Sequence, residues 1–187
     1  MSLKLKLLIV GGVFATMGLV ALFISLFADA SVHLVVAVDR SIELYANGER
    51  LTPKRSAGDH QDFSLAQGDY TFTVKDTEHG TERTYTLALD SGWDDYVLPI
   101  DERQCFTRLD VSKTMYSRRG DSGRPSAPTI VERISTHAPF AKRSSDYLDE
   151  SDMPKSRKRG RSVMLLAEVD CEALTLPDGE LLSEVGF

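Results

Sequence analysis

The feature that most constrains this chain is an uncharged run of 21 residues, Leu7–Phe27, of which sixteen are apolar. At about 1.5 Å of helical rise per residue the run spans roughly 30 Å, the thickness of a bilayer's hydrocarbon core. Lys4 and Lys6 precede the run and Asp29 follows it, and positively charged residues stay on the cytoplasmic side of a membrane. The run therefore predicts one transmembrane helix at 7–27, with residues 1–6 in the cytoplasm and the C-terminal part outside.

The same region also fits a cleaved signal peptide. Ala28-Asp29-Ala30 is a small-residue cleavage motif, and cleavage there would leave Ser31 as the first residue of a soluble exported domain. Signal peptides usually have apolar regions of about 7–15 residues, which favours an uncleaved anchor for this longer run. No cysteine lies near the run, so a lipoprotein anchor is excluded.

Small residues recur close to one face of the predicted membrane helix: Gly11, Ala15, Gly18 and Ser25. Small side chains let helices pack closely in lipid, so this face is a candidate for helix pairing. Glycine and alanine are also common in membrane helices of every kind, which is the plainer interpretation of the pattern.

Residues 31–115 have the pattern of short strands separated by turns. Residues 70–74 alternate strictly between apolar and polar side chains, and residues 85–89 repeat the alternation, as half-buried strands do. Asn47-Gly48 separates two further strand-like runs and predicts a tight hairpin, because both residues tolerate positive φ. Short strands with turns every 8–12 residues or so are typical of antiparallel β-sandwiches or barrels. The predicted fold class is mainly β: an antiparallel β-sandwich preceded by the single N-terminal transmembrane helix.

Residues 116–162 differ in composition from the strands before them. They hold nine serines, four of the seven prolines, and 11 basic against 6 acidic residues. The flanking segments, 31–115 and 163–187, each carry a net charge of −6. The composition predicts a polar cationic loop inserted into an anionic β-domain, with one candidate strand at 130–134. Residues 163–187 are expected to supply a closing strand and a C-terminal tail with a short helix.

Part of the strand region resembles a known family of modules. Residues 65–74, Leu-Ala-Gln-Gly-Asp-Tyr-Thr-Phe-Thr-Val, resemble the L-x-x-G-x-Y-x-x-x-V signature of PEGA-type and related carboxypeptidase-regulatory-like β-sandwich modules. The resemblance covers residues 32–100 or so, although the P-E-G-A tetrapeptide itself is absent. It implies a non-catalytic binding or spacer domain in a bacterial envelope, with the anchor in the inner membrane and the domain in the periplasm.

The two cysteines are predicted to form a disulfide. Cys105 opens one expected strand and Cys171 follows the end of another, and in an antiparallel pair those ends meet. Disulfides persist in the oxidising compartment to which an exported domain is sent. Two buried free thiols are the alternative interpretation.

Five cations lie within seven residues near the end of the loop: Lys155, Arg157, Lys158, Arg159 and Arg161. Outside the cytoplasm, nucleic acid is not an available partner. An anionic lipid surface or envelope polymer remains a candidate, at about 1 kcal/mol per cation near an anionic surface. A solvated loop, neutralised by acidic residues 146–152, is the plainer interpretation.

Other polar clusters carry little functional signal. Asp59, His60 and Asp62 are possible metal ligands, but one loop with three such residues is weak support, and no metal or other cofactor is predicted. Asp94 and Asp95 beside Trp93 could contact a sugar, whereas a strand-edge tryptophan packed over the core is the favoured interpretation.

The sequence as a whole favours a non-catalytic, membrane-anchored interaction or structural module, with no catalytic residues assigned. The expected partners are the lipid bilayer and either another envelope protein or an anionic envelope polymer. A cleaved, soluble periplasmic binding protein is the main alternative. A hydrolase with a site between Trp93 and the loop at 116–162 is a weaker one, since it needs a pocket with converging polar groups.

Overall fold

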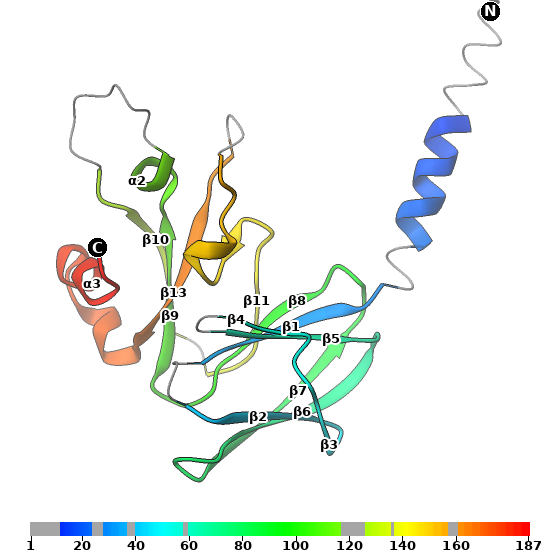
Figure 1. Cartoon of the computed structure of the whole chain (residues 1–187), viewed down its shortest axis with the longest axis horizontal. Helices are drawn as coiled ribbons and strands as arrows, with labels where there is room; N and C mark the ends of the chain where they lie inside the picture. Colours follow the sequence, from blue (N-terminus) through cyan, green and yellow to red (C-terminus); the bar gives the residue numbers. More distant parts are fainter. Residues whose placement is uncertain are drawn as a thin grey trace, which may run out of the picture.

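The computed structural model describes residues 12–23, 28–36, 40–57, 60–116, 126–135, 137–156 and 161–187. Within these ranges the chain is mainly β, as predicted, and its strands form three sheets (Figure 1). Sheet A has the order β11 (Phe140–Ala141), β8 (Asp95–Leu98), β1 (Ala30–Val35), β5 (His60–Leu65) and β4 (Arg55–Ala57).

Sheet B is a meander built on the predicted hairpin. Its order is β3 (Glu49–Arg50), β2 (Ile42–Ala46), β6 (Gly68–Asp76) and β7 (Thr81–Leu89), all antiparallel. Asn47 and Gly48 make the β2–β3 turn with φ values of 51° and 86°. This left-handed backbone suits asparagine and glycine, so the hairpin prediction is confirmed.

Sheet C carries Cys105 in one of its strands, and another of its strands ends directly before Cys171. Its order is β10 (Thr129–Ile134), β9 (Gln104–Asp110), β13 (Met164–Asp170) and β12 (Asp146–Tyr147). Short helices follow or join its strands: α2 (Ser112–Tyr116), η1 (Glu150–Asp152), η2 (Cys171–Thr175) and α3 (Asp178–Glu184).

Sheet A packs between the other two sheets. Val32 and Leu34 of β1 face a core shared with sheet B, where they meet Leu44 and Phe72 among others, as in a β-sandwich. On the opposite face of sheet A, Val35 and Val97 pack against Phe106 and Leu166 of sheet C. The other face of sheet C is covered by η2 and α3.

The structure corrects two expectations about the strands. The pairing is not wholly antiparallel, since β1 runs parallel to β8 and β12 runs parallel to β13. The segment 116–162 is not a single loop, because β10, β11 and β12 lie within it and extend sheets A and C. Its strands are short and half exposed, so they lack the strict apolar alternation that reveals a longer strand.

The boundary of the expected sandwich also changes. The segment 31–115 was expected to form one unit, but β9, within it, pairs with β10 and β13 rather than with sheets A and B. The end of the segment, from Ser112, is the short helix α2 rather than a strand. The two-sheet sandwich is therefore built mainly from residues 30–98, with β11 added at one edge of sheet A. The third sheet takes strands from both sides of the predicted loop and from within it.

Residues 12–23 of the predicted membrane span form a helix, which extends away from the sheets beside the start of β1 (Figure 1). Residues 7–11 and 24–27 of that span lie outside the described residues. Among the described residues, no helix is both long and apolar enough to cross a membrane. The side chains of Val13, Phe14 and Leu19 are at least half exposed.

Candidate functional site

The face of sheet A that is turned toward sheet C carries a cluster of charged side chains centred on His33. Because side chains alternate along a strand, the burial of Val32 and Leu34 in the core directs His33 to the opposite face. Asp62 of β5 lies directly across from His33, and Asp95 begins β8 on its other side. The histidine side chain is only 11% exposed.

Both ring nitrogens of His33 contact a carboxylate. Nδ1 lies 2.6 Å from an oxygen of Asp62, and Nε2 lies 2.7 Å from an oxygen of Asp95. An ionised carboxylate can only accept hydrogen bonds, so two such contacts require both nitrogens to be protonated. The geometry therefore fits an imidazolium held between two carboxylates.

The electrostatics of this pair of contacts favour the charged forms. Burial by itself would lower the pKa of His33, but its hydrogen bonds to Asp62 and Asp95 and the charges of both carboxylates raise it above the ordinary value of 6.5. Burial would raise the pKa of each aspartate, but hydrogen bonding to His33 and its charge lower both below 3.8. The three groups stabilise one another as ions.

Lys142 and His60 extend the cluster in two directions. The Lys142 ammonium lies 2.9 Å from the second oxygen of Asp95, which ties the chain after β11 to β8. His60, on the same face of β5 as Asp62, is 3% exposed, and its Nε2 lies 3.3 Å from Asp152. Arg55 of β4 donates a 2.6 Å hydrogen bond to that aspartate. The cluster thus joins sheet A to the segment 142–152.

A second buried ionic group lies on sheet C. Arg108 of β9 is 2% exposed and donates through Nε and Nη2 to both oxygens of Asp146, at 2.9–3.1 Å. The Asp146 side chain is fully buried, and Arg108 also contacts Glu132 of β10. Arg143 donates a further 2.8 Å hydrogen bond to Glu132. Bidentate pairing of this kind is the strong form of an arginine–carboxylate contact.

The two ionic groups share a shallow pocket of about 290 Å³. Its charged lining comes from His33, Arg55, His60, Asp62, Lys142, Asp146 and Asp152. Pockets that bind small molecules usually have volumes of about 300–1,000 Å³ and mostly apolar walls. Among the described residues, no group of histidines, cysteines and carboxylates is arranged to hold a metal ion. The arrangement is best suited to holding three parts of the fold together by charge.

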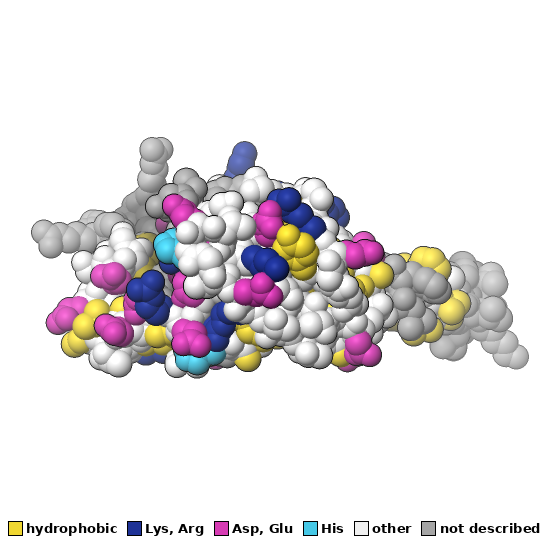
Figure 2. All heavy atoms as spheres, turned by 90° about the horizontal axis from the view of Figure 1, so that it is seen from below, with side chains coloured by type: hydrophobic (Ala, Val, Ile, Leu, Met, Phe, Trp, Pro, Cys, Tyr) yellow, Lys and Arg dark blue, Asp and Glu magenta, His cyan; other side chains and the backbone are white. Residues whose placement is uncertain are grey.

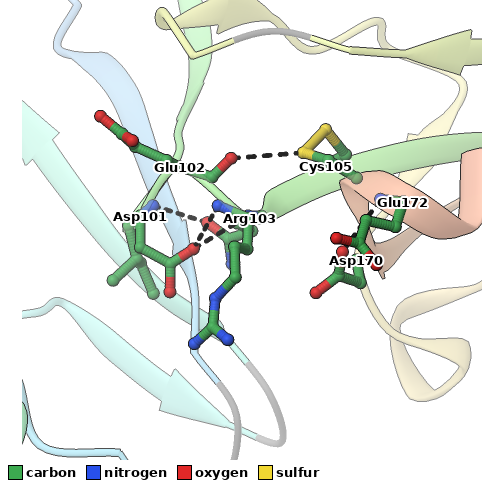
Figure 3. The surroundings of a disulfide bond; sticks show 9 residues. Asp101, Glu102, Arg103, Cys105, Asp170 and Glu172 are labelled. Carbon is green, nitrogen blue, oxygen red and sulfur yellow. Dashed lines mark hydrogen bonds between the residues drawn. A yellow bond between two sulfur atoms is a disulfide. The ribbon is translucent and has the colours of Figure 1, made fainter.

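The predicted disulfide is present (Figure 3). Cys105 lies on β9 opposite Val169 of β13, and Cys171 begins η2 directly after β13 ends. Their Cα atoms are 4.9 Å apart. The backbone is held on both sides, since Asp101 accepts a 2.8 Å hydrogen bond from the amide of Arg103 and Asp170 caps η2 through the amide of Glu172.

The predicted basic run is only partly described. Lys155 and Arg161 are exposed, whereas Arg157, Lys158 and Arg159 lie outside the described residues. Arg161 lines a pocket of about 660 Å³ whose other walls are rich in serine, including Ser144 and Ser156. The predicted preference of the basic run for anionic partners stays a prediction.

The other residues singled out in the sequence are placed as follows. Ala15 and Gly18 are exposed on the helix at 12–23, and Gly11 and Ser25 lie outside the described residues. Asp59 also lies outside them, whereas His60 and Asp62 belong to the ionic cluster.

Trp93 does not pack over the core as expected. Its side chain is 65% exposed, because it belongs to the turn between β7 and β8 and not to a strand edge. The neighbouring carboxylates are already engaged, since Asp94 accepts hydrogen bonds from the amides of Asp90 and Ser91. Asp95 binds His33 and Lys142, so the proposed sugar-contacting group of Trp93, Asp94 and Asp95 is not assembled.

Several members of the ionic groups were not predicted, among them His33, Arg108, Lys142 and Asp146. His33 stands between two buried apolar residues, Val32 and Leu34, so the alternation along its strand is a signal that could have found it. Arg108 has no such signal, because it lies between Thr107 and Leu109 in a strand that is buried on both faces. Lys142 follows a strand, and Asp146 begins another, that is too short to show a pattern.

Comparison with known proteins gives no match, whether to a family model, a curated protein sequence or a solved structure. The resemblance of residues 32–100 to PEGA-type modules therefore stays a prediction.

Proposed function

We propose that this chain is a membrane-anchored, non-catalytic interaction or structural module of a bacterial cell envelope. In this proposal residues 7–27 cross the inner membrane, the N-terminus is cytoplasmic and the β-domain is periplasmic. The helix at 12–23 exposes apolar side chains that the domain does not cover, such as Val13 and Phe14. A helix that is apolar all round needs a hydrophobic environment, and a bilayer provides one.

The observation that carries the proposal is how the chain continues after the apolar run. Ala30 is fully buried in the core between sheets A and B and pairs with Leu65. Asp29 accepts a 3.0 Å hydrogen bond from Ser64. Cleavage after Ala30 would remove these contacts from the domain, which favours an uncleaved anchor over a soluble binding protein.

The disulfide supports an extracytoplasmic domain. Disulfides persist in the periplasm and outside the cell, whereas cytoplasmic thiols are kept reduced. Cys105 and Cys171 are the only cysteines of the chain, and both are used in the one bond.

Two further observations support a structural or binding role for the domain. Because both nitrogens of His33 are occupied by carboxylates, the ring has no nitrogen left to exchange a proton with a substrate. In PEGA-type modules a strand ends at the Leu of the signature, and the Gly turns the chain into the next strand. The same arrangement is found at residues 65–74, where β5 ends at Leu65 and β6 begins at Gly68.

Topology can be tested in a bacterium that expresses the full chain. Membranes are washed with alkaline carbonate, and spheroplasts and intact cells are treated with trypsin. The chain is expected to stay with the membranes and to be cut in spheroplasts but not in intact cells, because Lys155 is exposed. A cytoplasmic marker protein serves as the control for leakage. Protection of the chain until the spheroplasts are lysed would contradict the proposed orientation.

An anionic envelope polymer is the partner class that the basic run favours. The test compares binding of the detergent-solubilised full chain to an alginate column with that of a variant carrying glutamine at all five basic positions. The native chain is expected to bind and to elute as salt rises, because exposed charges are screened within about 10 Å at 0.1 M salt. Equal retention of both proteins at every salt concentration would contradict this partner.

A further inference from the structure

The turn that carries Trp93 touches the residue that leaves the apolar run. A Cβ atom on Gly92 would lie 2.4 Å from Cβ of Ala28 and 2.7 Å from its carbonyl oxygen, so these two backbones are in direct contact. The amide of Ser31 donates a 2.8 Å hydrogen bond to the carbonyl of Asp94. The start of the domain is therefore fastened to the turn at 90–94.

The turn itself is held by its own hydrogen bonds. The Asp94 carboxylate accepts from the amides of Asp90 and Ser91, at 2.6 and 3.0 Å. The amide of Trp93 donates to the Ser91 hydroxyl at 2.9 Å. These bonds hold the backbone of the turn, and the Trp93 side chain is 65% exposed.

This position sets the height of Trp93 above the membrane. Consecutive Cα atoms are about 3.8 Å apart. Trp93 is one residue from Gly92, which contacts Ala28, and Ala28 follows Phe27, the last residue of the run. The headgroup layer adds roughly 5–7 Å to each side of the hydrocarbon core. If the run spans the bilayer, the turn lies at the level of that layer.

Tryptophan is enriched at the interface between membrane and water, where its ring is in an apolar environment and its N–H is solvated. Three of the nearby carboxylates accept hydrogen bonds within the domain: Asp94 from backbone amides, Asp95 from His33 and Lys142, and Asp29 from Ser64. The contact is thus of the aromatic kind and not an attraction to anionic lipid.

We infer that the Trp93 side chain inserts into the phospholipid headgroup layer next to the point where the chain leaves the membrane, and so sets the orientation of the β-domain on the bilayer. This inference rests on the proposed membrane anchor. Figure 2 shows acidic and basic side chains interspersed over one face of the molecule.

The test uses the intrinsic fluorescence of the full chain, because Trp93 is its only tryptophan. The protein is inserted into phosphatidylcholine vesicles whose acyl chains carry bromine either near the headgroup or near the methyl end. Bromine near the headgroup is expected to quench the emission more than bromine near the methyl end, and aqueous iodide is expected to quench it weakly. The emission maximum is also expected to shift to shorter wavelength relative to the protein in denaturant.

A matched variant provides the control for a tryptophan away from the membrane. It combines Trp93→Phe with Val131→Trp, at a position that is 49% exposed on β10, on the far side of the sheets from the N-terminal helix (Figure 1). Its emission is expected to be quenched by iodide and not by brominated lipid.

The outcomes separate the inference from the proposed function. Flotation of the native protein with the vesicles, together with iodide quenching as strong as in the control, would overturn the inference and leave the anchor standing. Quenching mainly by bromine near the methyl end would also overturn it. Failure of the protein to float with the vesicles would overturn both the anchor and the inference.

Discussion

His33 determines how the stability of the domain depends on pH. Its pKa is raised in the folded state, so its contribution is complete below the unfolded value of 6.5 and is lost as the pH rises through the folded value. The pKa values of Asp62 and Asp95 are lowered, so their contributions are complete above 3.8 and are lost as the pH falls through the folded values. All three contribute fully between those two limits.

Replacing His33 with glutamine tests this dependence. The His33→Gln variant is expected to lose about 1–3 kcal/mol of unfolding free energy at about pH 5, since two partly buried carboxylates lose a charged partner. The loss should be smaller at about pH 8, which lies above the unfolded value of 6.5, because the contribution of His33 declines from that value up to its raised folded pKa. Urea denaturation at both pH values measures it, with exposed His137→Gln as the control. An equal loss at both pH values would mean that His33 is not the titrating group.

Arg108 has a larger expected effect because its partner cannot reach water. The Arg108→Met variant leaves the buried Asp146 carboxylate without its counterion, at a cost of about 3–5 kcal/mol. The double variant Arg108→Met/Asp146→Leu should recover part of that loss, because neither charge remains. Arg50→Met, which removes a 65% exposed partner of Glu43, is the matched control and should cost much less. Equal losses for the two single variants would contradict a structural role for the buried pair.

At the scale of elements, the contact between Ala28 and the turn at 90–94 depends on one glycine. The Gly92→Ala variant is expected to lose about 1–3 kcal/mol of stability, because its Cβ would collide with backbone atoms of Ala28 that cannot move aside cheaply. Gly179→Ala is the control: it lies in α3, where a Cβ meets no atom within 4 Å, and should be neutral or slightly stabilising. Thermal denaturation compares the two. Similar midpoints would show that the contact does not hold the start of the domain.

Local patterns predicted the elements that depend on neighbouring residues. The alternation at residues 70–74 and 85–89 predicted β6 and β7, and Asn47-Gly48 predicted the turn of the β2–β3 hairpin. The ionic cluster could not be predicted in this way. Alternation places His33 on the face of its strand opposite to Val32 and Leu34, but it does not say that β8, some sixty residues later, lies parallel beside it. Strands such as β11 and β12 are too short to carry a period at all.

At the scale of the whole molecule, the disulfide closes the third sheet. It links residues separated by 66 positions, so in the chain-entropy model its loss would cost about 4 kcal/mol, and measured losses are typically about 2–4 kcal/mol. The Cys105→Ala/Cys171→Ala variant is expected to unfold at lower urea concentration than the native protein. Reduction of the native protein should give a loss of similar size. A variant as stable as the oxidised protein would mean that the bond is dispensable for sheet C.

At the scale of the whole molecule, the residues that follow the apolar run are fastened to the domain. Ala28, Asp29 and Ala30 are in contact with the turn at 90–94, with Ser64 and with the core, respectively. Under the proposed membrane anchor, the attachment of the domain begins at Ala28, the first residue after the run. The proposed anchored, extracytoplasmic domain requires that residues 1–30 are retained and that Cys105 and Cys171 form a disulfide.

The intact mass of the protein, purified without reductant from washed membranes, tests both requirements in one measurement. The account predicts a species that retains residues 1–30 and is lighter by two hydrogens than the fully reduced chain, because Cys105 and Cys171 are joined. Treatment with reductant should restore those two hydrogens. A mass that corresponds to a chain beginning at Ser31, or one with both thiols free, would contradict it.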